Sequence, residues 1–87
     1  MLSAKKMFKA LQQAGVKVVK YEESKDPNFM DGDVVLENSL NVQVGFDYAC
    51  LCLVKDDGID YLLEVEEVHN EIDIATQIAR FLQTWQT

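Results

Sequence analysis

The stretch NVQVGFDYACLCLVKDDGIDYLLEVEE, residues 41–67, decides the fold, because β-branched and aromatic residues recur in it between short turn signals. Together with the residues just before it, the stretch predicts four strands, at 34–37, 40–44, 48–55 and 59–68. The turns between them are as short as Asn38-Ser39 and Asp57-Gly58. Because such short turns join neighbouring antiparallel strands, the sequence predicts an antiparallel meander.

The segments on either side of the meander predict two helices. Residues 3–14 place one apolar stripe at helical spacing, with Ser3 as the cap and Gly15 as the residue that ends the helix. Residues 72–85 place a second such stripe after a cap at Asn70, and a further strand at 16–21 precedes a loop at 22–32. The 87 residues are therefore predicted to form a single α+β domain, an antiparallel meander of four to five strands with an N-terminal and a C-terminal helix packed on the sheet.

The Asp57-Gly58 pair predicts the register of the last hairpin, because Asp-Gly is a preferred two-residue hairpin loop. In that register one face is apolar and is expected to lie against the helices; it carries Cys50, Cys52, Val54, Tyr61, Leu63 and Val65. The other face has a leucine cluster within a charged ring: Leu51, Leu53 and Leu62 among Lys55, Asp60, Glu64 and Glu66. Such a cluster is either covered by the fold or offered to a partner.

The turn at Gly45 leaves two arrangements open for the strand at 40–44. A two-residue Gly45-Phe46 loop places the apolar residues of that strand on the leucine side. A three-residue loop that includes Asp47 places them with the cysteines instead. Both loops fit the sequence.

The formal charge of −7 is unevenly distributed along the chain. Residues 1–25 carry a balance of +4, whereas residues 26–87 carry −11. Direct binding to nucleic acid is not expected, because phosphate contacts require a basic field. The longest apolar run has seven residues, far below the roughly 20 that a membrane helix needs, so we expect a cytoplasmic protein that does not enter the membrane.

Two groups of residues have the chemistry of a metal site or a general base. Cys50 and Cys52 lie two positions apart, where strand geometry gives them one face and no sound disulfide, and we expect them to be core residues. His69 lies near Glu66, Glu67 and Glu71, but a single histidine at the junction of a strand and a helix is more often a surface or capping residue. We therefore predict no catalytic residue, no metal and no cofactor, and a metal-dependent enzyme centred on His69 is the least favoured alternative.

Residues 56–73 carry eight acidic side chains and no Lys or Arg. Alternate strand residues stand about 6.5 to 7 Å apart, close to the spacing of phosphates along one nucleic-acid strand, so a row of carboxylates can attract a basic cleft. The candidate partner-binding residues are Asp56, Asp57, Asp60, Glu64 and Glu66, with apolar contact from Leu51, Leu53 and Leu62. The simpler interpretation is that these acids are the solvated side of an edge strand and keep the protein soluble.

The chain resembles the short acidic α+β proteins that phages and prophages encode, through NVQVGFDYACLCL at 41–53 and EIDIATQIARFLQTW at 71–85. The resemblance covers length, composition and element order. It implies a phage-derived interaction protein, in a group that includes inhibitors of bacterial defence systems, some of them similar to DNA in charge. The basic first helix departs from a wholly acidic DNA mimic.

Two hypotheses follow. The leading one is a non-enzymatic inhibitor or adaptor whose acidic sheet edge binds a basic protein surface, for instance that of a nucleic-acid-binding protein. The alternative is a structural or virion-type subunit that forms homo-oligomers, in which the basic helix of one copy meets the acidic face of another and the outer leucines are buried.

Overall fold

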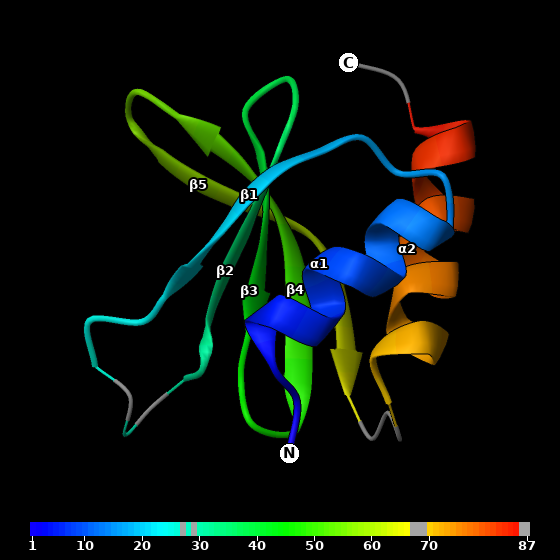
Figure 1. Cartoon of the computed structure of the whole chain (residues 1–87). Coiled ribbons are helices and arrows are strands. Elements are labelled where there is room, and N and C mark those ends of the chain that lie inside the picture. Colours follow the sequence, from blue (N-terminus) through cyan, green and yellow to red (C-terminus); the bar gives the residue numbers. More distant parts are fainter. Residues whose placement is uncertain (27, 29, 67–69, 86–87) are drawn as a thin grey trace.

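A computed structural model of the chain describes residues 1–26, 28, 30–66 and 70–85. It contains two helices and five strands (Figure 1). In chain order they are α1 (Ala4–Gln13), β1 (Val18–Glu23), β2 (Gly32–Leu36), β3 (Leu40–Val44), β4 (Tyr48–Lys55), β5 (Gly58–Glu66) and α2 (Glu71–Thr84). The predicted extension of the last strand to residue 68 lies outside the described residues.

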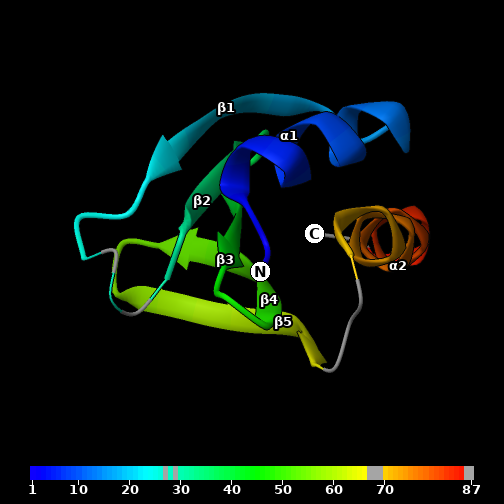
Figure 2. The same ribbon diagram turned by 60° about the horizontal axis from the view of Figure 1, so that its bottom comes forward.

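The five strands form one sheet in the order β1-β2-β3-β4-β5, and every neighbouring pair is antiparallel. In Figure 2 the strands form an arc from β1 to β5, and both helices lie on the inner side of that arc. Helix α1 contacts β1, β2 and α2, while α2 also reaches β5. The predicted α+β meander with a helix at each end is thus confirmed, with five strands.

The inner face of the sheet is decided by the alternation in β2 and β3, where every second residue is buried. Val34 lies opposite Val42, which lies opposite Leu51, and all three side chains are fully buried. Both helices cover this row with their own apolar stripes, Met7 and Leu11 in α1 and Ile74 and Ile78 in α2. Because β2 and β3 carry polar or half-buried residues on their other side, only one face of the sheet suits the helices.

The predicted register of the β4–β5 hairpin is wrong. Its turn consists of Asp56 and Asp57, and Gly58 is already the first residue of β5, opposite Lys55. Gly58 has φ +149°, a conformation that L side chains rarely adopt, so the glycine serves the strand end rather than the loop centre. A β-bulge at Leu62 then shifts the pairing by one residue, so that Leu51 lies opposite Leu63 rather than opposite Leu62.

The bulge determines which side chains of β5 share a face with which of β4. Before it, Tyr61 lies opposite Cys52, as the predicted division of faces requires. After it, Leu63 lies opposite Leu51 and Val65 opposite Ala49, so Leu63 and Val65 belong with the leucines and not with the cysteines. A bulge has this effect because one extra residue reverses the side-chain alternation along the rest of the strand.

The prediction that the cysteine face lies against the helices is also wrong. Leu51 belongs to the buried core, and Leu53 and Leu62 are partly buried against it, so the fold covers the leucine cluster. Strand β3 falls on this same side, because Val44 lies opposite Ala49. This is the placement that the two-residue Gly45-Phe46 loop predicted. The tip of the turn, however, lies one residue later than predicted, because the Gly45 amide donates a hydrogen bond to the Tyr48 carbonyl at 2.9 Å.

The N-terminus of α1 is capped from three parts of the chain. The Ser3 hydroxyl accepts a hydrogen bond from the Lys6 amide at 3.3 Å, as its predicted capping role requires. In addition, the Ser3 amide donates to Glu71 Oε2 at 2.9 Å and the Ala4 amide donates to Asp31 Oδ2 at 2.7 Å. The first turn of α1 has no acidic residue of its own, so these two distant carboxylates supply the negative charge that a helix N-terminus favours.

We expect Asp31→Ala to lower the free energy of unfolding by about 1–2 kcal/mol, because it removes a charge-assisted bond to an otherwise unsatisfied helix amide. Denaturant unfolding followed by circular dichroism measures the change. Asp47→Ala is the control: Asp47 is exposed and has no hydrogen bond or ion pair within the described chain, so its effect should stay within about 0.5 kcal/mol. Equal effects of the two substitutions would contradict the capping role.

The β2–β3 turn holds two residues in the left-handed region. Asn38 has φ 61° and Ser39 has φ 65°, as a two-residue type I′ turn requires at both central positions. Asparagine tolerates this conformation, whereas serine has no such preference and glycine would adopt it without steric cost. The turn therefore contains a position at which the natural residue is not the most stable one.

We expect Ser39→Gly to raise the free energy of unfolding by about 0.5–1 kcal/mol. The matched control is Gly15→Ala at the end of α1, where φ is +89° and no atom lies within 4 Å of an added Cβ, so that only the backbone is affected. It should lower stability by about 1 kcal/mol. Thermal unfolding of both variants measures the two changes in stability. If both variants were stabilised or both destabilised, the left-handed backbone would not be what determines stability at these two positions.

Candidate functional site

The helix-free side of the sheet, called the outer face below, carries two rows of side chains that cross all five strands. The pairing of the strands aligns each row residue by residue. The first row is Lys20, Val35, Asn41, Cys52 and Tyr61, and the second is Glu22, Asp33, Gln43, Cys50 and Glu64. The first row has no acid and carries Val35, Cys52 and Tyr61 beside Lys20 and Asn41, whereas the second row carries three acids, so the outer face has an apolar half and an acidic half.

The apolar half ends in an exposed patch beside the β4–β5 turn. Val54 lies opposite Ile59, and Tyr61 follows two residues later on the same side of β5. These three side chains are 46%, 44% and 58% exposed, although each is large and mainly apolar. A contiguous apolar patch at the edge of a charged surface is characteristic of interaction sites.

The acidic half draws on strands at both edges of the sheet. Asp33 Oδ1 accepts a hydrogen bond from Asn41 Nδ2 at 3.1 Å, which holds the carboxylate across the sheet. Glu22 forms an ion pair with Lys20 at 2.7 Å, and the hydrogen bond and charge of that lysine lower the pKa of the Glu22 carboxyl. Glu64 is exposed and lies in no ion pair within the described chain.

The structure does not bring the predicted acidic residues together as one row. Asp56 and Asp57 are exposed in the turn. Asp60 lies opposite Leu53, hence on the inner side of β5, and forms an ion pair with Lys55 at 2.5 Å. Glu64 lies beyond the bulge, on the outer face, opposite Cys50.

The remaining predicted residues fare differently. The backbone of Glu66, at the end of β5, pairs with Tyr48 of β4. The side chain of Glu66 lies outside the described part, as does His69. Leu51, Leu53 and Leu62 supply no exposed cluster, because they pack into or against the core. The apolar contact area predicted for them is instead offered by Val54, Ile59 and Tyr61. Val54 and Tyr61 had been predicted to lie against the helices, because the wrong face of the sheet was assigned to them.

Sequence reasoning also missed the acids Glu22 and Asp33, which come from β1 and β2 rather than from the acidic stretch at 56–73. The alternation in GDVVL, residues 32–36, contained the signal for Asp33: Val34 and Leu36 point inward, so Asp33 must point outward.

The two cysteines are buried thiols on the outer face, although no helix covers them. Cys52 lies between Asn41 and Tyr61 in its row, and larger neighbours on both sides shield a small side chain. Burial raises the pKa of the Cys52 thiol to about 11, and the nearby Cys50, Asp33 and Glu64 act in the same direction. A thiol of this kind is protonated at neutral pH and is a poor nucleophile or metal ligand.

Because of the raised pKa of Cys52, we expect the free energy of unfolding to fall as the pH rises from 9 to 11. The unfolded thiol ionises near its ordinary pKa of 9.0, whereas the folded thiol keeps its proton up to about pH 11, so the rising pH favours the unfolded state. We expect the free energy of unfolding of Cys52→Ala to fall less steeply over this interval than that of the natural protein. Urea unfolding at several pH values gives both slopes, and identical slopes would contradict the prediction.

Among the side chains that the structure describes, no group of three or more His, Cys, Asp or Glu residues could hold a metal ion. Within the same residues, no helix is both long and apolar enough to cross a membrane.

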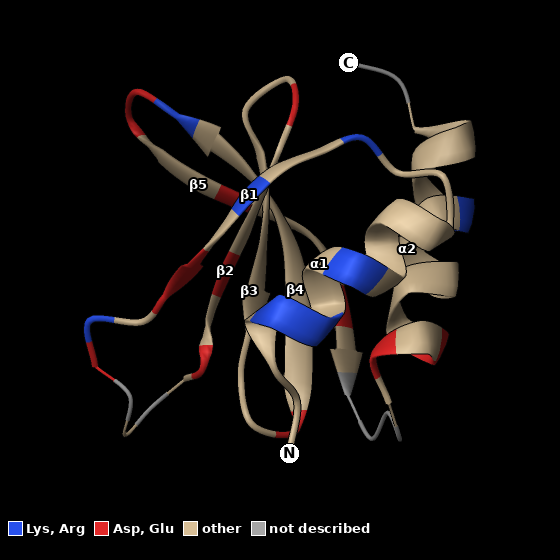
Figure 3. Ribbon diagram, viewed as in Figure 1, with Lys and Arg blue, Asp and Glu red and all other residues tan. Residues whose placement is uncertain are grey.

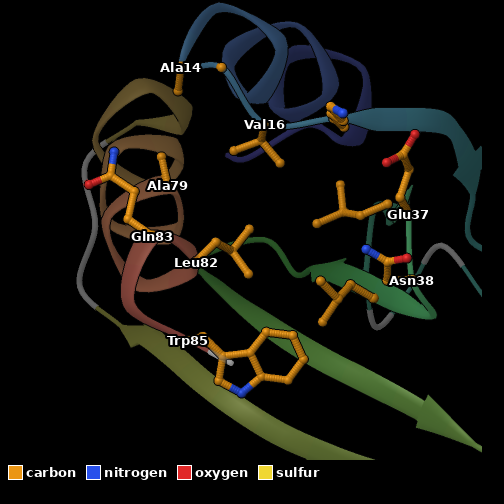
Figure 4. A pocket seen from close by; sticks show the side chains of 12 residues that line it. Ala14, Val16, Glu37, Asn38, Ala79, Leu82, Gln83 and Trp85 are labelled. Carbon is orange, nitrogen blue, oxygen red and sulfur yellow. The ribbon is translucent and has the colours of Figure 1, made fainter. Parts of the chain in front are cut away.

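A hollow of about 650 Å³ lies away from the outer face, where α1, α2 and the β2–β3 turn meet (Figure 4). Val16, Leu82 and Trp85 form part of its wall, and Lys17, Glu37 and Asn38 bring polar groups to it. The ionisable residues of its described lining are Lys17 and Glu37, which are of opposite charge and both exposed. The hollow therefore combines an apolar wall with one acidic and one basic group.

The charges of the molecule are partly segregated in space. Figure 3 shows basic residues along α1, with others on β1, the loop after it, the end of β4 and α2, and acidic residues on the strands, the turns and the first turn of α2. Lys5, Lys6 and Lys9 of α1 are exposed. Because α1 lies on the inner side of the arc, its lysines do not neutralise the outer face.

Comparisons of the chain with protein-family models, with curated proteins and with solved structures find no match.

Proposed function

We propose that this protein is a non-enzymatic interaction module that binds a basic protein partner through the outer face of its sheet. The observation that carries the proposal is the exposed patch of Val54, Ile59 and Tyr61 beside the acidic row that ends in Glu64. An apolar centre with a charged border is the usual anatomy of a protein–protein interface.

The two halves of the outer face would make different contributions to binding. Burying the three exposed apolar side chains removes apolar surface from water, which favours association and offsets part of the freedom that both partners lose on binding. The carboxylates of Asp33 and Glu64 add steering, which raises the association rate of a basic partner and makes it dependent on salt. Tyrosine is also among the residues that most often dominate interface energetics, which makes Tyr61 the expected anchor.

The shape of the sheet favours a concave partner. Because the strands arc around the helices, the outer face bulges outward (Figure 2), and its complement is a groove. A basic groove is typical of proteins that handle nucleic acid, so the proposal includes a phage-type inhibitor that occupies such a groove. The lysines of α1 limit any similarity to DNA to this one face.

Self-association as a structural subunit is the second candidate. The observation that favours it is the separation of the exposed lysines of α1 from the acidic outer face, which would allow one copy to pair with another head to tail. Light scattering at high protein concentration and low salt distinguishes the two candidates: a monomer excludes self-association, and a salt-sensitive oligomer supports it.

The experiment that tests the proposal is affinity capture from a lysate of the natural host with three forms of the protein. They are the natural chain, the outer-face variant Asp33→Lys with Glu64→Lys, and a control variant, Asp47→Lys with Glu23→Lys, in which exposed acids off the two rows are reversed. We expect a basic nucleic-acid-handling protein to be captured by the natural chain and by the control, and at least tenfold less by the outer-face variant.

A third variant, Tyr61→Ser, tests the apolar half and should also reduce capture while leaving the salt dependence in place. Circular dichroism and thermal unfolding of every variant establish that the fold is intact. Equal capture of the same partner by all folded variants would overturn the proposal.

A further inference from the structure

The hollow between the helix ends and the β2–β3 turn forms a second site that is independent of the outer face. None of its lining residues belongs to the two rows of the outer face. Its volume of about 650 Å³ lies within the range of about 300–1,000 Å³ that is usual for small-molecule sites. It is hollowed between three elements, so a ligand would contact α1, α2 and the sheet at once.

The wall of the hollow suits an apolar ligand body. Val16, Leu82 and Trp85 pack against the core but remain partly accessible, so each offers apolar surface that the fold leaves uncovered. In Figure 4 the Trp85 indole lies at the lower end of the hollow, with Leu82 beside it and Asn38 on the opposite wall. Trp85 is the single tryptophan of the chain, which makes the hollow directly observable by spectroscopy.

The electrostatics of the hollow favour a positive charge. Both helices end there, since the caps of α1 and α2, Ala14 and Trp85, are lining residues. A helix C-terminus carries about half a negative charge, and neither helix has a basic residue in its last turn to offset it. The Glu37 carboxylate adds a full negative charge, and the face of an indole ring attracts cations.

Among the described lining residues, Lys17 is the one whose charge opposes a bound cation. It is exposed and lies just after α1, where its long side chain can move toward solvent when a ligand enters. Its charge therefore competes with a bound cation for the same negative field, which gives the two ionisable residues of the hollow opposite expected effects.

We infer that the hollow binds a small organic cation with an apolar body, of the arylalkylammonium class. The apolar part lies against Val16, Leu82 and Trp85, and the ammonium group lies near Glu37 and the helix ends. The site does not depend on the proposed interaction with a basic partner.

The test is a titration of the isotope-labelled protein with three probes of one shape and different charge: phenethylammonium, 2-phenylethanol and phenylacetate. The readout is the single indole N–H signal of Trp85 in a ¹H–¹⁵N spectrum. We expect a saturable shift with phenethylammonium, binding several-fold weaker with the neutral alcohol, and no saturable shift with the anion.

Matched variants test the expected opposite effects of Glu37 and Lys17 on the binding of phenethylammonium. Glu37→Gln should weaken phenethylammonium binding about threefold to tenfold, and Lys17→Gln should strengthen it by a similar factor. Lys6→Gln, on the exposed side of α1, should leave it unchanged, as should the outer-face variant. Because Lys6, Lys17 and Glu37 are all exposed, the three substitutions at these positions are expected to leave the fold intact.

Preferential binding of phenylacetate, weaker binding by Lys17→Gln, or no saturable shift with any probe at tens of millimolar would overturn the inference. The outer-face variant should bind phenethylammonium as the natural protein does, so failure of this inference and failure of the proposed function can be told apart.

Discussion

The structure depends on one buried row, Val34, Val42 and Leu51, that runs across the three central strands. Because β2 and β3 are apolar on alternate residues only, this row fixes which side of the sheet receives the helices. Everything polar on those strands is thereby placed on the opposite side. The same constraint that builds the core therefore also gathers Asp33, Asn41 and Gln43 on the outer face.

The element types and their order were predictable from sequence, because turn residues and apolar periodicity are local signals. The division of the sheet into faces was not, and the reason lies in two residues. Gly58 begins a strand instead of centring a loop, and Leu62 is an extra residue whose apolar character fits either side. A bulge has no marked sequence signature when the bulged residue is a leucine between apolar neighbours, so Leu63 and Val65 were grouped with the cysteines, although they do pack toward the core as predicted.

The candidate site was predictable in part for the same reason. The acidic content of β5 and its turn is visible in the sequence, but the bulge separates Asp60 from Glu64 and leaves them on opposite sides of the strand. The outward position of Asp33 follows from the alternation in β2, but only the pairing between strands brings Glu22 of β1 beside it. The hollow at the helix ends is formed by residues from both ends of the chain, which no local pattern connects.

The cap of α1 has a consequence for the order in which the chain folds. The Ser3 amide donates a hydrogen bond to Glu71, 68 positions later in the sequence, and the Ala4 amide donates one to Asp31, 27 positions later. A ten-residue helix is marginal in water on its own, and here two lysines occupy its first turn. Helix α1 thus gains its full set of capping bonds only when α2 docks, so we expect its first turn to form late in the folding reaction and to open when the start of α2 moves away.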